Sequence, residues 1–319
     1  MPAAPATEPS ARARELVRGA YDLHVHVEPD LAKRRIDDLS LARRFAELGL
    51  AGFVLKSHYV PTAERAAVVR AAVPGVDALG AIALNAGVGG LNAQAVEIAA
   101  RGGARIVWLP TVDSENEAGE DGPKPAKQPV WRTIQNEFEA AGVAGGPVPV
   151  TPGALAPVLA VVARHDLVLA TGHLGRAEIH MAVDAALAAG VARVVVTHPD
   201  YPTQGVPVDE QRELAQGGAL LERCFAPIHT GKVSWEATFE AIRATGPAVN
   251  VLSTDLGQVA NPPVEDGLAL MADRLLEAGF SEDDVHTMAV VWKSCSIIRC
   301  RSVLPDPAGM TVAPIRSMP

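Results

Sequence analysis

Eight short apolar segments recur along the chain, and each is followed by a stretch of helical character. The apolar segments are Ala20–His26, Gly52–Ser57, Ala78–Asn85, Arg105–Pro110, Leu167–His173, Arg193–His198, Ala219–Cys224 and Val249–Asp255. Most are continuous runs of Val, Ile and Leu, a pattern typical of parallel strands that are buried on both faces. The alanine-rich segments that predict helices include Leu39–Leu48, Thr62–Ala72, Ala93–Arg101 and Ala177–Ala189.

Eight strand-then-helix units are the number at which a parallel sheet can close into a barrel. The competing fold is an open doubly wound sheet, in which a GxGxxG turn is expected after an early strand. The only early glycine cluster, at residues 87–90, lacks that spacing. We therefore predict a single (β/α)8 TIM barrel over residues 19–300, with a flexible N-terminal tail at 1–18 and a C-terminal tail at 301–319.

One connection breaks this rhythm. Residues 111–152, after the fourth strand, form a long segment with several Pro, Gly and charged residues. Connections of more than about 15 residues are usually functional or disordered. A connection that follows a barrel strand lies on the catalytic face, so this one predicts a lid or a substrate loop, with a plain surface excursion as the alternative.

Composition narrows the class of protein. The chain has 319 residues, of which 48% are hydrophobic, and a formal net charge of −9. An acidic chain without Lys/Arg clusters is a poor candidate for binding nucleic acid or an anionic membrane. No apolar run reaches the roughly 18–20 residues of a membrane span, and the three cysteines define no disulfide framework. We expect a cytoplasmic protein that acts on a small molecule. The protein can be a monomer or a homo-oligomer.

Histidines fall at one end of the predicted strands. Five of the nine lie at or just past the carboxyl ends of strand segments, and Asp255 ends the last strand in the same way. The five are His24, His26, His58, His173 and His198. In an α/β barrel these positions face the active site, so the pattern indicates a shared site rather than scattered core histidines.

The first strand carries the most specific pattern, an HxH pair. Side chains alternate across a strand, so His24 and His26 are expected on one side, where two imidazoles can share one divalent ion. Asp22 is expected on that side as well, deeper in the barrel. A pair of hydrogen-bonded histidines without an ion is the alternative, which the other strand-end residues make less attractive.

These motifs together resemble the amidohydrolase superfamily of metal-dependent hydrolases. The motifs are YDLHVH at 21–26, TGHL at 171–174, VTHP at 196–199 and STD at 253–255. In that family an HxH ends the first strand, single histidines end the fifth and sixth, and an aspartate ends the eighth. The resemblance covers residues 20–300 and implies a divalent metal cofactor, zinc in the first place, as one or two ions.

Carried over by this resemblance, His24 and His26 are ligands of the more buried ion. His173 becomes a ligand of the same ion or of a second one, and His198 a second-metal ligand or a transition-state stabiliser. Asp255 becomes both a metal ligand and the general base for the attacking water. The chemistry agrees, because zinc lowers the pKa of its bound water to about 7 and a nearby carboxylate can take the remaining proton.

The chain departs from the two-metal pattern at the fourth strand. A lysine or glutamate that bridges two ions is expected there, but residues 106–111 read IVWLPT and offer no ligand. The site then holds one ion, or a carboxylated Lys56 from the second strand bridges two. Lys56 is otherwise a substrate contact or a structural residue, and His58 and Asn85 are predicted to line the substrate pocket as well.

The predicted activity is hydrolysis of an amide, cyclic amide, lactone or amine-bearing small molecule by metal-activated water. A non-oxidative decarboxylase of the same superfamily is the alternative, since a one-metal site keeps it open. A barrel that binds a ligand without turnover is disfavoured because the presumed base, Asp255, is present.

Overall fold

The computed structural model describes residues 8–118, 129–142 and 145–290. Its centre is one sheet of eight strands that are hydrogen-bonded in sequence order, with every neighbouring pair parallel. The strands are β1 (Tyr21–Val25), β2 (Gly52–Leu55), β3 (Asp77–Ala83), β4 (Ala104–Trp108), β5 (Val168–Ala170), β6 (Arg193–Val196), β7 (Leu220–Cys224) and β8 (Asn250–Ser253). All eight predicted strands are confirmed, and each is shorter than predicted, in most cases because the polar residues at its carboxyl end lie outside the sheet.

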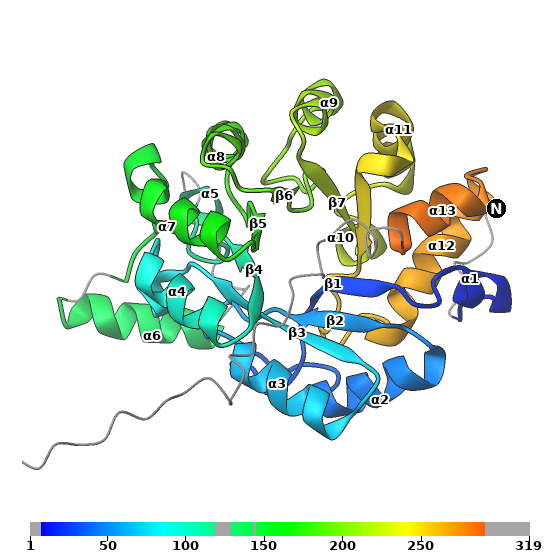
Figure 1. Cartoon of the computed structure of the whole chain (residues 1–319), viewed down its shortest axis with the longest axis horizontal. Coiled ribbons are helices and arrows are strands. Elements are labelled where there is room, and N and C mark those ends of the chain that lie inside the picture. Colours follow the sequence, from blue (N-terminus) through cyan, green and yellow to red (C-terminus); the bar gives the residue numbers. More distant parts are fainter. Residues whose placement is uncertain (1–7, 119–128, 143–144, 291–319) are drawn as a thin grey trace, which may run out of the picture.

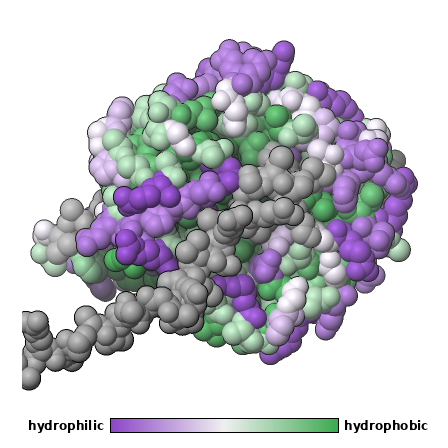
Figure 2. Space-filling view, viewed as in Figure 1, coloured by the Kyte–Doolittle hydropathy of each residue, from purple (hydrophilic) through white to green (hydrophobic). Residues whose placement is uncertain are grey.

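Helices surround the strands (Figure 1). The α-helices are α1 (Ala11–Leu16), α2 (Asp38–Leu48), α3 (Ala63–Ala72), α4 (Ala93–Arg101), α5 (Glu115–Ala118), α6 (Pro129–Ala140), α7 (Pro152–Arg164), α8 (Arg176–Ala188), α9 (Val208–Gln216), α10 (Phe225–His229), α11 (Trp235–Thr245), α12 (Gly267–Glu277) and α13 (Glu282–Ala289). The short 3-10 helices are η1 (Ala86–Val88), η2 (Pro247–Val249) and η3 (Val264–Asp266). Figure 2 shows that the outer side of the helical layer is rich in hydrophilic residues, for example where α9 lies at the top.

The sheet closes between its first and last strands. Asp255 N donates to His24 O at 2.8 Å, and His26 N donates to Leu256 O at 2.8 Å. Val25 and Leu256 form a parallel bridge between these hydrogen bonds. The predicted (β/α)8 barrel is therefore confirmed. The contact between β1 and β8, here called the seam, joins the two strands at whose carboxyl ends His24, His26 and Asp255 lie.

The apolar core has an inner part and an outer part. Inside the barrel, residues from seven of the strands pack together, among them Leu23, Ile106 and Trp108. Two further clusters of buried residues lie between the strands and the surrounding helices. Apolar side chains fill the barrel interior, and polar side chains are concentrated at the carboxyl ends of the strands. A site formed by polar groups is therefore expected at this mouth of the barrel.

The segment before β1 and the connection after β4 lie outside the regular barrel. Residues 8–18 do not form the predicted flexible tail, because they include α1, whose Ala13 and the following Val17 are buried in the outer core. The predicted tail at 301–319 lies outside the described residues. In the long connection after β4, Ser114 Oγ and Asn116 Nδ2 both donate to His173 O, at 3.0 and 3.1 Å. This part of the connection thus rests on the carboxyl end of β5.

Among the residues that the structure describes, no helix has the length and apolar character to cross a membrane.

Candidate metal centre

The end of β1 brings two histidines to the barrel mouth. His24 and His26 are almost fully buried. The pairing of β1 with β2 shifts register between Asp22 and Val25, and this irregularity interrupts the alternation of the strand. Leu23 packs inside the barrel, and the ring of the next residue, His24, also faces inward, 5.7 Å from the ring of Trp108.

Asp22 does not lie where the regular alternation predicts. Its carboxylate accepts hydrogen bonds from Thr254 Oγ1 at 2.5 Å, from Thr254 N at 3.0 Å and from His24 N at 3.1 Å. Since its neighbour Leu23 points into the barrel, Asp22 points away from the interior. The prediction that Asp22 accompanies the two histidines was wrong. The residue instead ties the backbone of β1 to that of β8.

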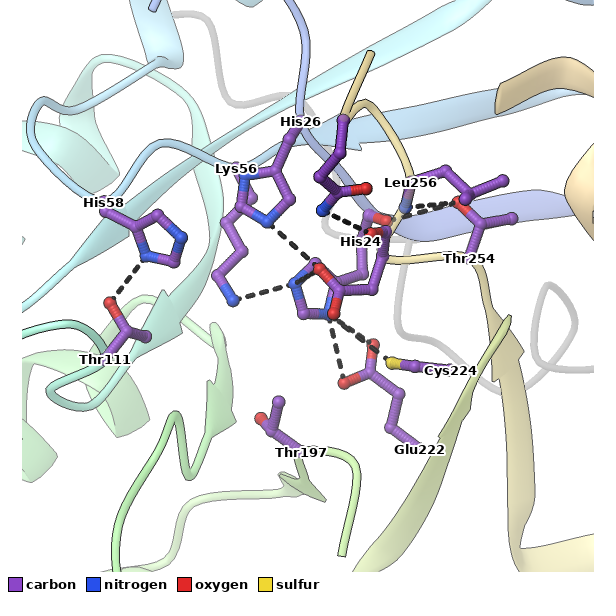
Figure 3. Close-up of polar contacts among 12 residues, drawn as sticks. His24, His26, Lys56, His58, Thr111, Thr197, Glu222, Cys224, Thr254 and Leu256 are labelled. Atoms are coloured by element: carbon purple, nitrogen blue, oxygen red, sulfur yellow. Dashed lines mark hydrogen bonds and ion pairs between the residues drawn. The ribbon is translucent and has the colours of Figure 1, made fainter. Parts of the chain in front are cut away.

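Three candidate ligand atoms converge at the seam (Figure 3). Asp255 Oδ1 lies 3.1 Å from His24 Nε2 and 3.2 Å from His26 Nε2. Ligands that each lie about 2.0–2.2 Å from one tetrahedral zinc ion are separated by about 3.3–3.6 Å. The spacing of the three atoms is close to that value, and the donor set of two imidazoles and one carboxylate is one that zinc accepts. These residues fit a divalent ion.

The backbone is unusual where these side chains are positioned. Asp255 has φ 52° and His198 has φ 27°, in the left-handed region that side chains rarely adopt. Gly257 has φ 133°, and a Cβ there would lie 1.6 Å from His26 O, so only glycine lets the chain after β8 pass this close to β1. Unfavourable backbone at the ends of strands is a common property of functional sites.

The other three predicted histidines complete a circle around the mouth. Neighbouring rings are 4.9 Å apart for His26 and His58, 5.9 Å for His58 and His173, and 5.1 Å for His173 and His198. The ring of His198 is 6.2 Å from that of His24, which closes the circle. Among the described residues, however, the nitrogen atoms of these three do not belong to a group of converging donors. His173 Nδ1 lies 3.2 Å from Glu117 Oε1 instead.

Lys56 approaches the same centre from β2. Its Nζ atom lies 2.8 Å from His24 Nε2 and 5.1 Å from the centre of the Trp108 ring, and the residue is 3% exposed. Burial lowers the pKa of Lys56 against the opposing effect of Asp255 and Glu222. The indole of Trp108 thus lies at the end of β4, where the pattern of the amidohydrolase superfamily has a bridging ligand. The lysine nearest to the donor atoms is Lys56, which follows β2.

Asn85, which was predicted to line the substrate pocket, is surrounded by hydrogen-bond partners from the protein. Its Nδ2 donates to His58 O at 2.8 Å and to Thr111 Oγ1 at 2.6 Å, and its Oδ1 accepts from Thr111 N and Asp113 N. These four hydrogen bonds use every donor and acceptor of the amide. Asn85 is therefore part of the frame of the site, with no polar atom left for a substrate. Through Thr111 Oγ1 it also reaches His58 Nδ1, which lies 2.8 Å from that oxygen.

Opposing charges set the protonation of the centre. Burial and Lys56 lower the pKa of His24, but Asp255 and Glu222 outweigh them and raise it to about 9. Burial alone would raise the pKa of Asp255, whereas His24 and His26 beside it hold that pKa well below its ordinary value. Burial, assisted by His173, lowers the pKa of His198 to about 3. Asp255 is thus ionised and His198 neutral near pH 7.

Sequence reasoning missed two residues of β7 that face His24 from the inner side. Glu222 Oε1 lies 3.3 Å and Cys224 Sγ lies 3.7 Å from His24 Nδ1, and both side chains are buried. The signal was present, because a glutamate inside a buried strand needs a polar partner. Neither residue stands out as a motif, and only the folded barrel brings them to a histidine about 200 positions away.

Comparison with known proteins gives a family and a fold. Residues 19–222 match the model of a family of unknown function, DUF6282. No curated protein matches the chain. Solved structures with a similar fold include an amidohydrolase from Pseudomonas aeruginosa, with 13% identity and a TM-score of 0.54, where the match covers 88% of this chain and 96% of that one.

Two more solved structures also have a similar fold at low sequence identity. A D-hydantoinase is 11% identical with a TM-score of 0.54, and the match covers 86% of this chain and 69% of the other. A lactonase template engineered for organophosphate hydrolysis is 15% identical with a TM-score of 0.53, with 87% and 94% covered. At these identities the likeness shows the fold, which agrees with the resemblance to the amidohydrolase superfamily.

Proposed function

Because the chain belongs to DUF6282, a family of unknown function, its activity has to be inferred from its site, and we propose that it is a metal-dependent hydrolase of a small molecule. The observation that carries this proposal is the convergence of His24 Nε2, His26 Nε2 and Asp255 Oδ1 at the mouth of the barrel. A divalent ion held by these three residues would supply a water of lowered pKa and would polarise the bond to be cleaved.

The residues around this point have complementary tasks. Asp255 is ionised and 20% exposed at its side chain, so it can accept a proton from the attacking water and pass it to the leaving group. His198 faces the same space from β6 as a neutral imidazole, which can donate a hydrogen bond to an oxygen that gains negative charge. His173 stands beside it as a further candidate ligand.

The substrate class follows from the reaction. An amide, cyclic amide, lactone or amine-bearing carbon is attacked by water under these conditions, and similar barrels are known as a hydantoinase and a lactonase. Lys56 and His58 are the candidate substrate contacts. A buried lysine beside the donor atoms would attract an anionic group of a substrate, because an ammonium ion in such surroundings needs a negative partner.

Metal content and activity test this proposal directly. The protein as purified should contain a divalent transition ion, and exhaustive chelation should abolish hydrolysis of any amide or lactone in a substrate panel, with recovery when zinc is restored. His26→Ala should lose tight binding of this ion, whereas His286→Ala, on the exposed part of α13, should not. Full hydrolytic activity of a metal-free preparation would refute the proposal.

A decarboxylase is the alternative within the same site, and one observation keeps it open. The end of β4 presents Trp108 and no bridging ligand, so the geometry favours one ion at the mouth. The substrate panel should therefore include activated carboxylic acids, with release of CO2 as the readout. Metal-dependent CO2 release without hydrolysis would replace the hydrolase assignment and leave the metal site intact.

A further inference from the structure

His24 has two ring nitrogen atoms, and each faces a separate group of candidate ligands. Nε2 points to Asp255, whereas Nδ1 points to the barrel interior, towards Glu222 and Cys224 (Figure 3). The ligand atoms of His24, Glu222 and Cys224 all lie within 4.8 Å of one another, and the three residues are buried. This inner group is here called the deep cluster, and the proposed hydrolysis uses neither Glu222, Cys224 nor the Nδ1 atom of His24.

The geometry of the deep cluster matches a shared ion better than a hydrogen-bonded network. The carboxylate of Glu222 is buried with contacts of 3.3 and 3.4 Å to one nitrogen, which are long for bonds to a carboxylate. Nitrogen, oxygen and sulfur ligands of one tetrahedral zinc ion are separated by about 3.3–3.6 Å. The separations from His24 Nδ1 of 3.3 Å to Glu222 and 3.7 Å to Cys224 are close to these values.

A second observation points to a ligand at the same place. Ser253 is the register partner of Cys224 in the sheet, so the two side chains lie on the same face. Ser253 Oγ is buried and has no hydrogen-bond partner among the described residues. A small cavity next to β7 is lined by Glu222 and Cys224 of this cluster and by His198, together with residues such as Pro227 and Thr238.

We propose that His24, Glu222 and Cys224 form a second cation site below the mouth, of the class that binds zinc, with the imidazole of His24 shared between the two ions. One thiolate, one carboxylate and one imidazole are a ligand set typical of zinc. When the ion binds, it displaces the proton of the Cys224 thiol and the Nδ1 proton of His24. The Lys56 ammonium next to the same imidazole offsets part of the negative charge that these ligands bring.

Cobalt binding tests this site without reference to any substrate. The chain, stripped of metal by chelation, is titrated with Co²⁺ while the near-ultraviolet thiolate-to-cobalt band is followed. We expect two ions per chain and a thiolate band. Cys224→Ser should remove the band and one ion, and Glu222→Gln should weaken the same ion by more than about 100-fold, since an outer partner alone changes metal affinity by 10–100-fold.

Three controls make the result decisive. His26→Ala should lose the ion at the mouth and keep the band, which separates this proposal from the proposed hydrolase. Replacing Cys295 and Cys300 by serine should leave the band unchanged. If Cys224→Ser does not fold, X-ray absorption of the zinc-loaded chain should detect one sulfur ligand. One ion per chain with no sulfur ligand would overturn the site and make Glu222 a hydrogen-bond partner of His24.

Discussion

The two sides of the barrel mouth both carry histidines, but they differ in what the ring nitrogens face. At the seam between β1 and β8, His24 and His26 direct nitrogens to one carboxylate oxygen of Asp255. On the opposite side, after β4 and β5, Thr111 contacts the ring of His58, which reaches it from the end of β2, and His173 lies against Glu117. His24 and His26 are thus turned towards one shared carboxylate oxygen, whereas His58 and His173 have separate partners.

We therefore propose that the ion binds at the seam and that the opposite side shapes the pocket. Changes at the seam should then affect metal binding and turnover strongly, whereas changes on the opposite side should affect substrate binding or stability. Three substitutions test this division, in order of decreasing expected effect.

The largest effect is expected at Asp255. Asp255→Asn keeps the shape of the side chain but removes the charge that accepts a proton, so turnover should fall by about 10²–10⁴-fold while the fold is retained. Steady-state kinetics with circular dichroism provide the measurement. Asp184→Asn, on the exposed face of α8, is the matched control. Near-normal turnover of Asp255→Asn would mean that another residue handles the proton.

Lys56 lies between the two sides, and its substitution sharpens the comparison. If the unmodified ammonium binds an anionic substrate group, Lys56→Met should raise KM and leave the number of bound ions unchanged, because binding common to the ground and transition states is lost. If Lys56 is carboxylated and bridges, the chain should lose one ion, and short carboxylates should restore part of the activity. Intact-protein mass, with or without added CO2, distinguishes these outcomes independently.

The smallest effect is expected at Thr111 on the opposite side. Thr111→Val removes the hydroxyl that contacts His58 Nδ1 and Asn85 Nδ2, and leaves buried polar atoms without that partner. We expect a loss of about 1–3 kcal/mol in the free energy of unfolding, measured by urea denaturation, with turnover reduced less than tenfold. Thr111→Ser keeps the hydroxyl and should retain most of the stability. A collapse of metal binding in Thr111→Val would contradict the division of the mouth.

The barrel was predictable from sequence because its strands are continuous apolar runs of the right number and each is separated by helical segments. The convergence of His24, His26 and Asp255 was predictable for a related reason, since the carboxyl ends of parallel strands meet at one mouth. The local apolar pattern predicts both the strands and the positions where they end. The ends of the strands in turn decide which side chains lie at the same mouth.

The failures have a different origin. The orientation of Asp22 depends on a register irregularity that no apolar pattern encodes. The hydrogen bonds of Asn85 come from residues after β2 and β4, and Glu222 faces a histidine across the barrel. Each of these contacts joins distant parts of the chain. The sequence position of one partner does not indicate which residue the other partner is.

The residues that close the ring are the ones that would bind the proposed ion, so metal loading would depend on the integrity of the whole chain. Since the candidate ligands come from positions 24, 26 and 255, they assemble only after the last strand has docked on the first. A nascent chain cannot hold the ion until β8 has been synthesised. An ion bound there would hold the first and last strands together, and at 1,000 times its Kd it would oppose unfolding by about 4 kcal/mol.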